Sequence, residues 1–189
     1  MPENLLRCSW AEGSDLERAY HDEEWGVPLH EDRGLFEMLT LEGAQAGLSW
    51  RLVLSRREHY RRAFHGFDIG RVAAISHTAL EALLADPGLI RHRQKIASVR
   101  ENARAALRLA EEQGGLGRFL WSFVDGKPLV NRPLTRGAVP ARTERSDAMS
   151  KALRKRGFRF VGSTICYALM QASGMVDDHL ADCFRARPT

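Results

Sequence analysis

Residues 83–96 have the sequence Leu83-Leu84-Ala85-Asp86-Pro87-Gly88-Leu89-Ile90-Arg91-His92-Arg93-Gln94-Lys95-Ile96. The Pro87-Gly88 pair ends one helical segment, and neither proline nor glycine interrupts the next one before Gly114. This pattern predicts two helices joined by a tight turn, a helix-hairpin-helix motif whose second helix begins with basic residues. An ordinary corner between two helices, with no ligand, accounts for the same pattern.

The predicted hairpin has the chemistry to hold a DNA phosphate. A tight turn at Gly88 exposes backbone N–H groups at the start of the next helix, where the helix dipole favours an anion. Three basic residues, Arg91, Arg93 and Lys95, follow this turn. We therefore expect these four residues to contact the DNA backbone, which positions a duplex without distinguishing its sequence.

Helical signals also dominate the rest of the chain. Ser14 and Glu17 have the spacing of a capping box, and Asp32 and Ser49 are the expected starts of two further helices. Apolar spacing and terminal glycines predict helices over 14–25, 32–47, 50–64, 78–85, 146–156 and 163–173, with a short one after Asp68. No segment resembles a linker or a long strand, and 126–142 is the longest irregular stretch. The sequence thus predicts an all-α protein in which residues 1–189 form a single compact unit.

The two parts of the chain carry opposite charge. Residues 1–50 contain three Lys or Arg against eleven Asp or Glu, whereas residues 51–189 contain 25 against 13. A basic face of this kind suits a polyanion such as DNA or RNA, although arginine-rich helices that are merely solvated give the same count.

Other features of the sequence exclude several classes of protein. No apolar run reaches the 18 residues of a membrane span, and the first residues lack the basic start and apolar stretch of a secretion signal. The three cysteines, Cys8, Cys166 and Cys183, are too few for a disulfide scaffold and suit a reducing compartment. We therefore expect a cytoplasmic protein that does not contact membranes.

Two cysteines and two histidines near the chain ends could form a metal site. Cys8 precedes His21 by 13 residues, and His179 precedes Cys183 by four, a spacing that places both side chains on one face of a helical turn. Four such ligands complete a tetrahedral Zn²⁺ shell with no open position, which implies a structural ion. The alternative is a surface histidine with two small buried thiols.

A third group of residues could form a pocket for a flat ligand. Glu42 lies in an apolar and small-residue segment between Leu41 and Trp50, and Tyr20 is a second aromatic candidate. A carboxylate in an apolar cleft needs a partner or a ligand. An electron-poor or cationic purine would stack on the aromatic rings, compensate the charge of the carboxylate and donate a hydrogen bond from its exocyclic amino group. Alternatively, Glu42 faces solvent and Trp50 anchors the core.

Taken together, these residues resemble the type I DNA-3-methyladenine glycosylases of bacteria. The resemblance covers nearly the whole chain, from Cys8 to Cys183. The matching strings are Cys8-x-Trp10, Tyr20-His21-Asp22-x-Glu24-Trp25-Gly26-Val27-Pro28, Leu35-Phe36-Glu37-Met38, Leu41-Glu42-Gly43-x-Gln45-Ala46-Gly47-Leu48-Ser49-Trp50, Ile90-Arg91-His92-Arg93-x-Lys95-Ile96, Trp121-Ser122-Phe123, Ser146-Asp147-Ala148-x-Ser150-Lys151-Ala152-Leu153, Gly157-Phe158-x-Phe160-Val161-Gly162, Thr164-Ile165-Cys166-Tyr167 and Asp178-His179 with Cys183.

The resemblance implies a helix-hairpin-helix glycosylase fold with a structural zinc ion that joins a terminal lobe made of about 1–30 and 160–189. Its zinc ligands fall on Cys8, His21, His179 and Cys183, and its base-binding residues fall on Tyr20, Glu42 and Trp50. It implies an enzyme that binds alkylated double-stranded DNA, flips 3-methyladenine into the pocket and releases the free base. Nothing in the sequence suggests more than a monomer.

The expected chemistry follows from the substrate. A purine methylated on N3 is already cationic, so its glycosidic bond is weak and the enzyme has mainly to extrude and select the base. Leu48 is the expected wedge that fills the stack after the base is flipped out. The pocket strings contain no lysine that could form a Schiff base, which indicates a monofunctional hydrolase. One position departs from the family pattern: a second tyrosine is replaced by Glu17, so its stacking role is lost or passes to Trp10 or Phe36.

Two other functions remain as alternatives. A non-catalytic helix-hairpin-helix module would bind DNA through the basic hairpin and have no use for Glu42 and Trp50 in a pocket. A zinc hydrolase would use the Cys8, His21, His179 and Cys183 site as a catalytic metal and would need a labile coordination position.

Overall fold

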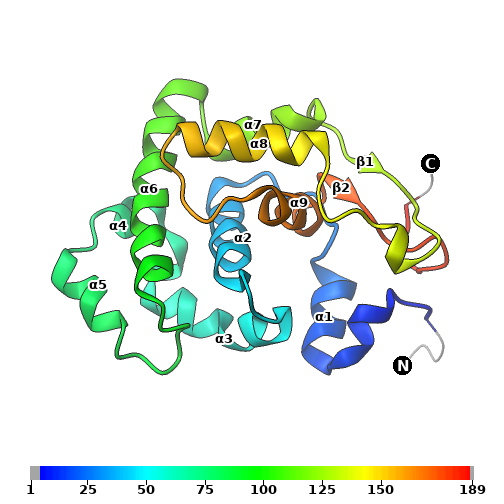
Figure 1. The fold of residues 1–189 in the computed structure, drawn as a ribbon, viewed down its shortest axis with the longest axis horizontal. Coiled ribbons are helices and arrows are strands. Elements are labelled where there is room, and N and C mark those ends of the chain that lie inside the picture. The colour runs from blue at the N-terminus through cyan, green and yellow to red at the C-terminus, as the bar shows by residue number, and fades with distance from the viewer. Residues whose placement is uncertain (1–4, 188–189) are drawn as a thin grey trace.

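The structure, a computed structural model that describes residues 5–187, is built almost entirely of helices (Figure 1). Nine α-helices lie in this part of the chain: α1 (Asp15–Glu23), α2 (Asp32–Gln45), α3 (Trp50–Ala63), α4 (Ile69–Ala73), α5 (His77–Leu83), α6 (Arg93–Gln113), α7 (Leu116–Trp121), α8 (Glu144–Lys155) and α9 (Ser163–Ala172). The same residues form four short 3-10 helices: η1 (Ser9–Gly13), η2 (His65–Phe67), η3 (Ser122–Val124) and η4 (Arg136–Ala138). Two strands of two residues, β1 (Leu129–Val130) and β2 (Val176–Asp177), pair in parallel. The mainly helical fold confirms the predicted class, and no described helix is long and apolar enough to cross a membrane.

Helix α2 lies at the centre of the molecule (Figure 1). It contacts α3, α6, α7 and α9, and every residue from 35 to 44 is buried. The apolar pattern predicted one broad buried face, but the surrounding helices cover the whole circumference. Three polar side chains of α2, Glu37, Thr40 and Glu42, are therefore inside the protein.

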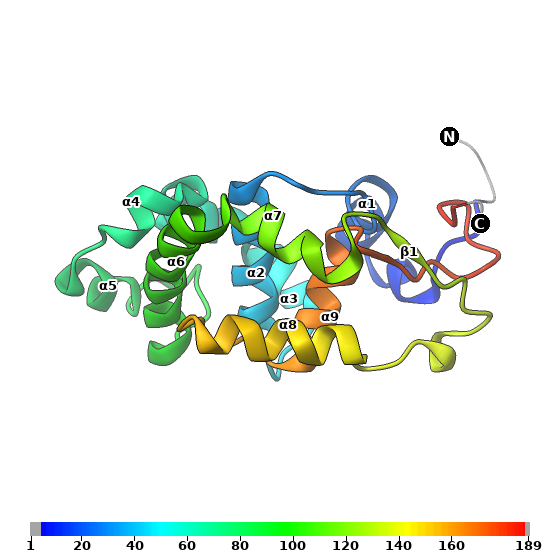
Figure 2. The ribbon, with the colours of Figure 1, turned by 90° about the horizontal axis from the view of Figure 1, so that it is seen from above.

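The two ends of the described chain meet beside α1. The amide of Phe184 donates to the carbonyl of Leu6 at 2.9 Å, and Arg187 Nη2 donates to the carbonyl of Gly26 at 2.6 Å. The blue N-terminal and red C-terminal segments thus share one end of the molecule (Figure 2). Helix α9 precedes this region and packs against α2 and α8 in the main core.

Local capping explains where several helices begin. Ser14 and Ser49 accept hydrogen bonds from the amides three residues on, as their spacing predicts. The start of α2 differs from the prediction because Glu31, not Asp32, caps it. The Asp32 carboxylate instead accepts from the amides of Leu116 and Gly117 and caps α7 across the fold.

The α5–α6 hairpin has a longer connection than the sequence predicted. Nine residues, 84–92, separate the two helices, so Gly88 lies five residues before α6 rather than at its start. The Gly88 amide donates to Asp86 Oδ1 at 2.7 Å, and a Cβ atom at this position would overlap the His59 ring of α3. Gly88 therefore permits close packing on α3 and does not present a free amide to a phosphate, which corrects the sequence-based expectation.

Lys95 also departs from its expected position. Its side chain is buried, and Nζ donates to the carbonyls of Ala44 at 2.8 Å and Ala46 at 2.7 Å. These carbonyls end α2, where the helix dipole favours a cation. Burial lowers the pKa of the Lys95 ammonium. Lys95 thus joins α6 to the end of α2 and does not face a DNA backbone.

The two arginines of the hairpin are both exposed but differ in their partners. Arg93 forms an ion pair with Glu81 of α5. Within residues 5–187, the Arg91 side chain has no hydrogen bond or ion pair, so its charge remains available.

Replacing Lys95 by Met keeps the length of the side chain but removes the donor to two helix-end carbonyls. Because buried unpaired polar groups cost about 1–3 kcal/mol each, we expect Lys95→Met to lower the unfolding free energy by about 2 kcal/mol in urea titrations. Lys151→Met, at an exposed lysine of α8, is the control and should change it by less than about 0.5 kcal/mol. Equal stability of the two variants would contradict the anchoring role.

Candidate functional site

Glu42 is a buried carboxyl group without a protein partner. Its residue is 5% exposed, and no hydrogen bond or ion pair from the described part of the chain reaches it. Glu37, the other buried glutamate of α2, instead accepts from Arg57 Nε at 2.5 Å and Arg61 Nε at 3.0 Å. The fold thus pairs one buried glutamate of α2 and leaves the other unpaired, which makes Glu42 a candidate ligand-binding group.

Burial changes the acidity of this region. It raises the pKa of Glu42 to about 8, so the carboxyl group is mainly protonated at neutral pH. Burial, followed by the nearby Glu42 charge, also raises the pKa of Tyr20. A cationic ligand beside Glu42 would favour its ionised form.

Aromatic rings surround this carboxyl group. The Tyr20 ring of α1 lies 5.3 Å from that of Trp50 at the start of α3, with 53° between their planes. Trp10 lies 6.3 Å from Tyr20 and 5.1 Å from Trp25, measured between ring centroids. The Trp50 Nε1 atom is buried and has no acceptor within residues 5–187. The site therefore offers flat apolar surfaces.

These side chains line a cavity of about 410 Å³ that opens to solvent. Its walls come from the 3-10 helices η1 and η4 and from the helices α1, α2, α3 and α9 or the residues next to them. The lining residues are Trp10, Glu17, Tyr20, Trp25, Glu42, Gln45, Ser49, Trp50, Arg136 and Ala168. The structure thus brings the three predicted base-binding residues together at one cavity.

Glu17 lies in the wall of the same cavity and is ion-paired. Its Oε2 atom accepts from Arg51 Nε at 2.8 Å and from Ser14 Oγ at 2.9 Å. Of the two rings expected to replace a tyrosine here, Trp10 lines the cavity, whereas Phe36 is fully buried against Phe67 in the core. An additional ring at this cavity therefore comes from Trp10.

Leu48 lies on the turn between α2 and α3. It is 38% exposed, and its amide donates to the carbonyl of Gln45 at 2.6 Å. Gly47 has a φ of +80°, which favours glycine, and a Cβ there would meet no atom within 4 Å. The turn thus holds an apolar side chain outward beside the cavity residues Gln45 and Ser49.

The predicted metal ligands gather behind the cavity. The ligand atoms of Cys8, His21 and Cys183 lie within 4.8 Å of one another, and all three residues are buried. The Cys183 Sγ atom is 3.4 Å from His21 Nε2. His179 is close, with its ring centroid 5.2 Å from that of His21 and a buried Nε2 that has no partner among residues 5–187.

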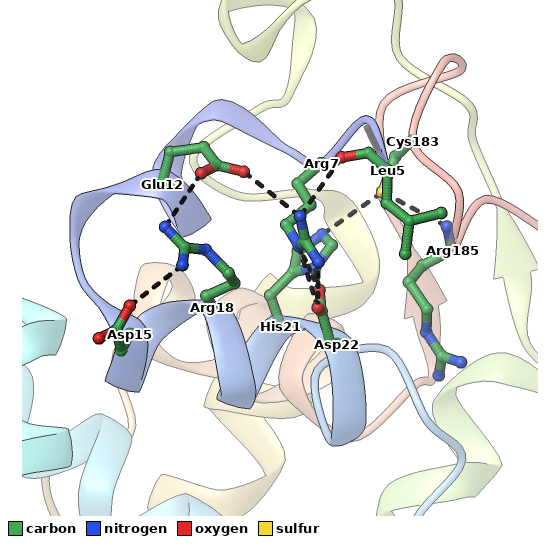
Figure 3. Close-up of polar contacts among 9 residues, drawn as sticks. All are labelled: Leu5, Arg7, Glu12, Asp15, Arg18, His21, Asp22, Cys183 and Arg185. Atoms are coloured by element: carbon green, nitrogen blue, oxygen red, sulfur yellow. Dashed lines mark hydrogen bonds and ion pairs between the residues drawn. The ribbon is translucent and has the colours of Figure 1, made fainter. Parts of the chain in front are cut away.

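Surrounding groups orient this Cys/His cluster. His21 Nδ1 lies 2.8 Å from Asp22 Oδ1, and His179 Nδ1 lies 2.7 Å from Asp177 Oδ1, which leaves both Nε2 atoms directed inward. Arg7 holds Asp22 in turn, and the amide of Arg185 donates to Cys183 Sγ at 3.5 Å (Figure 3). Carboxylates behind histidines and amides on sulfur are the usual support of a metal site.

Several residues of the site could not be recognised from local patterns. Arg136, Ala168 and Gln45 line the cavity because of tertiary packing, and no spacing rule links them to Glu42. Asp22 and Asp177 were more accessible to inference, since each lies within two residues of a candidate histidine.

The raised pKa of Glu42 makes stability depend on pH. Between about pH 5 and 8 the unfolded chain has lost this proton while the folded protein keeps it, so raising the pH favours unfolding. From pH 6 to 8.5 we expect wild type to lose about 2 kcal/mol of unfolding free energy relative to Glu42→Gln, measured by urea denaturation. If the unfolding free energies of wild type and Glu42→Gln change with pH in the same way, the pKa of Glu42 is not raised.

Comparison with known proteins agrees with this geometry. The family model described as methyladenine glycosylase matches residues 10–186. The chain is 51% identical to DNA-3-methyladenine glycosylase 1 of Escherichia coli strain K12, over 95% of this chain and 96% of that protein. It is 48% identical to DNA-3-methyladenine glycosylase of Haemophilus influenzae, over 94% and 96%. A crystal structure of 3-methyladenine DNA glycosylase I superposes with a TM-score of 0.94 at 50% identity, covering 96% of this chain and 100% of that one. The chain belongs to the methyladenine glycosylase family.

Proposed function

We propose that this protein hydrolyses the N-glycosidic bond of 3-methyladenine in alkylated double-stranded DNA and releases the free base. The observation that carries the proposal is the unpaired, buried Glu42 in an aromatic cavity of a methyladenine glycosylase family member. A related structure, from Staphylococcus aureus, is described as the structural basis of 3-methyladenine recognition, with a TM-score of 0.93 at 31% identity over 97% of each chain.

The cavity suits a flipped cationic purine. Tyr20 and Trp50 offer stacking surfaces, and Glu42 offers a carboxylate to the charge and the exocyclic amino group. Normal adenine is neutral and would leave Glu42 either protonated or uncompensated. The site therefore favours the lesion over the normal base by charge as well as by shape.

The reaction needs little help with the leaving group because N3-methylation already makes the base cationic. Stacking and the Glu42 interaction offset the few kcal/mol needed to extrude the nucleotide. Among residues 5–187, no lysine lines the cavity, and Lys95 is bound to carbonyls of α2. These facts support a monofunctional hydrolase in which water attacks the sugar and no Schiff base forms.

The DNA contacts form a second part of the proposal. Leu48 projects from the turn beside the cavity and would fill the stack that the flipped base leaves. Arg91 of the hairpin is exposed and free to contact a phosphate. Arg93 would first have to leave Glu81, so its contribution is smaller than the sequence suggested.

The base pocket is tested by Glu42→Gln, which keeps the size of the side chain but cannot carry charge. We expect release of free 3-methyladenine from methylated duplex DNA to fall about 10- to 100-fold, because a charge-assisted hydrogen bond is lost. Released 7-methylguanine, measured in the same sample, should stay low in both proteins. Glu23→Gln, at an exposed glutamate of α1 with no bond among the described residues, is the matched control and should act as wild type.

A folded wild-type protein that releases no base would contradict the enzymatic proposal. The non-catalytic DNA-binding module would then be the better account, and duplex binding should be unchanged by Glu42→Gln.

We also propose that Cys8, His21, His179 and Cys183 hold one structural Zn²⁺. The donor set fits the ion because two sulfur and two nitrogen ligands form a closed tetrahedral shell, and the orphaned Nε2 of His179 supplies the fourth ligand. When bound, the ion would cross-link the two chain ends and would offer no position to a reacting water. Burial raises the pKa of the Cys8 thiol to about 12, so a cation is needed to hold a thiolate here.

Metal removal separates a structural from a catalytic ion. We expect about one zinc per purified chain, and its removal by a chelator should lower Tm by on the order of 10 °C. Cys183→Ser should lose the metal, whereas the control Cys166→Ala, at a buried thiol of the main core, should retain it. Loss of turnover with an unchanged Tm would instead favour the zinc hydrolase.

The organisation of the chain follows from the same proposal. Residues 1–189 act as one unit, with a terminal lobe tied to the main core; the structure supports this with hydrogen bonds between the chain ends. Three free buried cysteines suit the reducing cytoplasm.

A further inference from the structure

Arg136 is a basic residue that lines the cavity and has no side-chain partner among residues 5–187. It begins η4, in the stretch 126–142 for which the sequence indicated no regular structure. The side chain is exposed and forms no hydrogen bond or ion pair with any residue from 5 to 187. An exposed residue that also lines the cavity lies at its mouth.

The segment that carries Arg136 is held in place. On its N-terminal side, Arg132 Nε donates to the carbonyl of Arg187 at 2.8 Å, and the amide of Ala181 donates to the carbonyl of Pro133 at 3.0 Å. On its C-terminal side, Val139 packs against the hydrophobic core. The backbone that carries Arg136 is therefore anchored on both sides, which keeps this residue beside the cavity.

The other charges at this mouth are accounted for. Glu17 and Arg51 neutralise each other through the 2.8 Å ion pair. Glu42 is buried deeper, at 5% exposed, and is reserved for the base. Arg136 therefore brings one uncompensated positive charge to the cavity mouth.

A flipped nucleotide would supply the missing anion. When its base is in the cavity, the sugar and its two flanking phosphates remain at the opening. We propose that Arg136 binds a DNA backbone phosphate next to the flipped nucleotide. This inference rests on the proposed base pocket.

This contact has two expected properties. It strengthens the binding of DNA but not of the free base, because only DNA brings a phosphate to the mouth. It also releases about one counterion, so it contributes about 0.9 to the slope of log affinity against log salt concentration.

The experiment compares wild type, Arg136→Gln and Arg136→Lys in binding a duplex with a stable abasic-site analogue at several salt concentrations. Arg136→Gln should weaken binding on the order of fivefold at 0.1 M salt and reduce the slope by about one. Arg136→Lys keeps the charge and should keep the slope. All three proteins should bind free 3-methyladenine equally, followed by tryptophan fluorescence.

Arg62→Gln is the matched control. Arg62 is exposed, has no side-chain bond in the described structure, and lies 12 residues along α3 from Trp50, a distance of about 18 Å. For Arg62→Gln, the slope of log affinity against log salt concentration should remain that of wild type. An unchanged slope in Arg136→Gln, or an equal change in Arg62→Gln, would overturn the local phosphate contact.

Free 3-methyladenine separates this inference from the pocket on which it rests. If wild type does not bind the free base, the base pocket is wrong and the inference falls with it. If the base binds normally and Arg136→Gln has the wild-type slope, the phosphate contact alone is wrong. Weaker binding of the free base to Arg136→Gln would instead place the guanidinium on the base and also overturn the proposal.

Discussion

The burial of a carboxyl group on the central helix is the constraint on which the rest of the site depends. Placing Glu42 in its cavity raises its pKa from 4.5 to about 8, so its ionisation costs about 5 kcal/mol more there than in water. The fold tolerates this because the group is neutral while the cavity is empty. A cation that enters the cavity recovers much of that energy, and a neutral base does not. The proposed selection of a charged lesion would thus follow from where α2 places one side chain.

The position of α2 is set by groups that do not touch the cavity. Asp32 joins its first turn to α7, and the Lys95 ammonium holds the carbonyls at its last turn. The same ammonium fixes the start of the turn that carries Leu48 and leads to Trp50. A basic residue of the hairpin thus serves the site from inside, by holding together the elements that would flip and stack a nucleotide.

Local signals predicted much of the fold but only part of the site. Caps such as Ser49 act on their own helix, so the helix starts near them could be inferred from sequence. Asp32 and Lys95 have the residue types of a cap and a phosphate ligand, but their partners are more than 45 positions away in the chain. Gly88 illustrates the same limit, because only the approach of His59 reveals its role. Long-range packing decides what these residues do, and the local spacing of residues does not predict such contacts.

The Cys/His cluster and the cavity are mechanically connected through α1. His21 belongs to the cluster and Tyr20, its neighbour, lines the cavity, while Trp10 and Trp25 contact His21 and line the cavity as well. The other wall, Glu42 and Trp50, belongs to α2 and α3 of the main core. The width of the cavity therefore depends on how firmly the chain ends hold α1 against that core. The closed metal shell proposed for these residues would stabilise the aromatic wall without taking part in the chemistry.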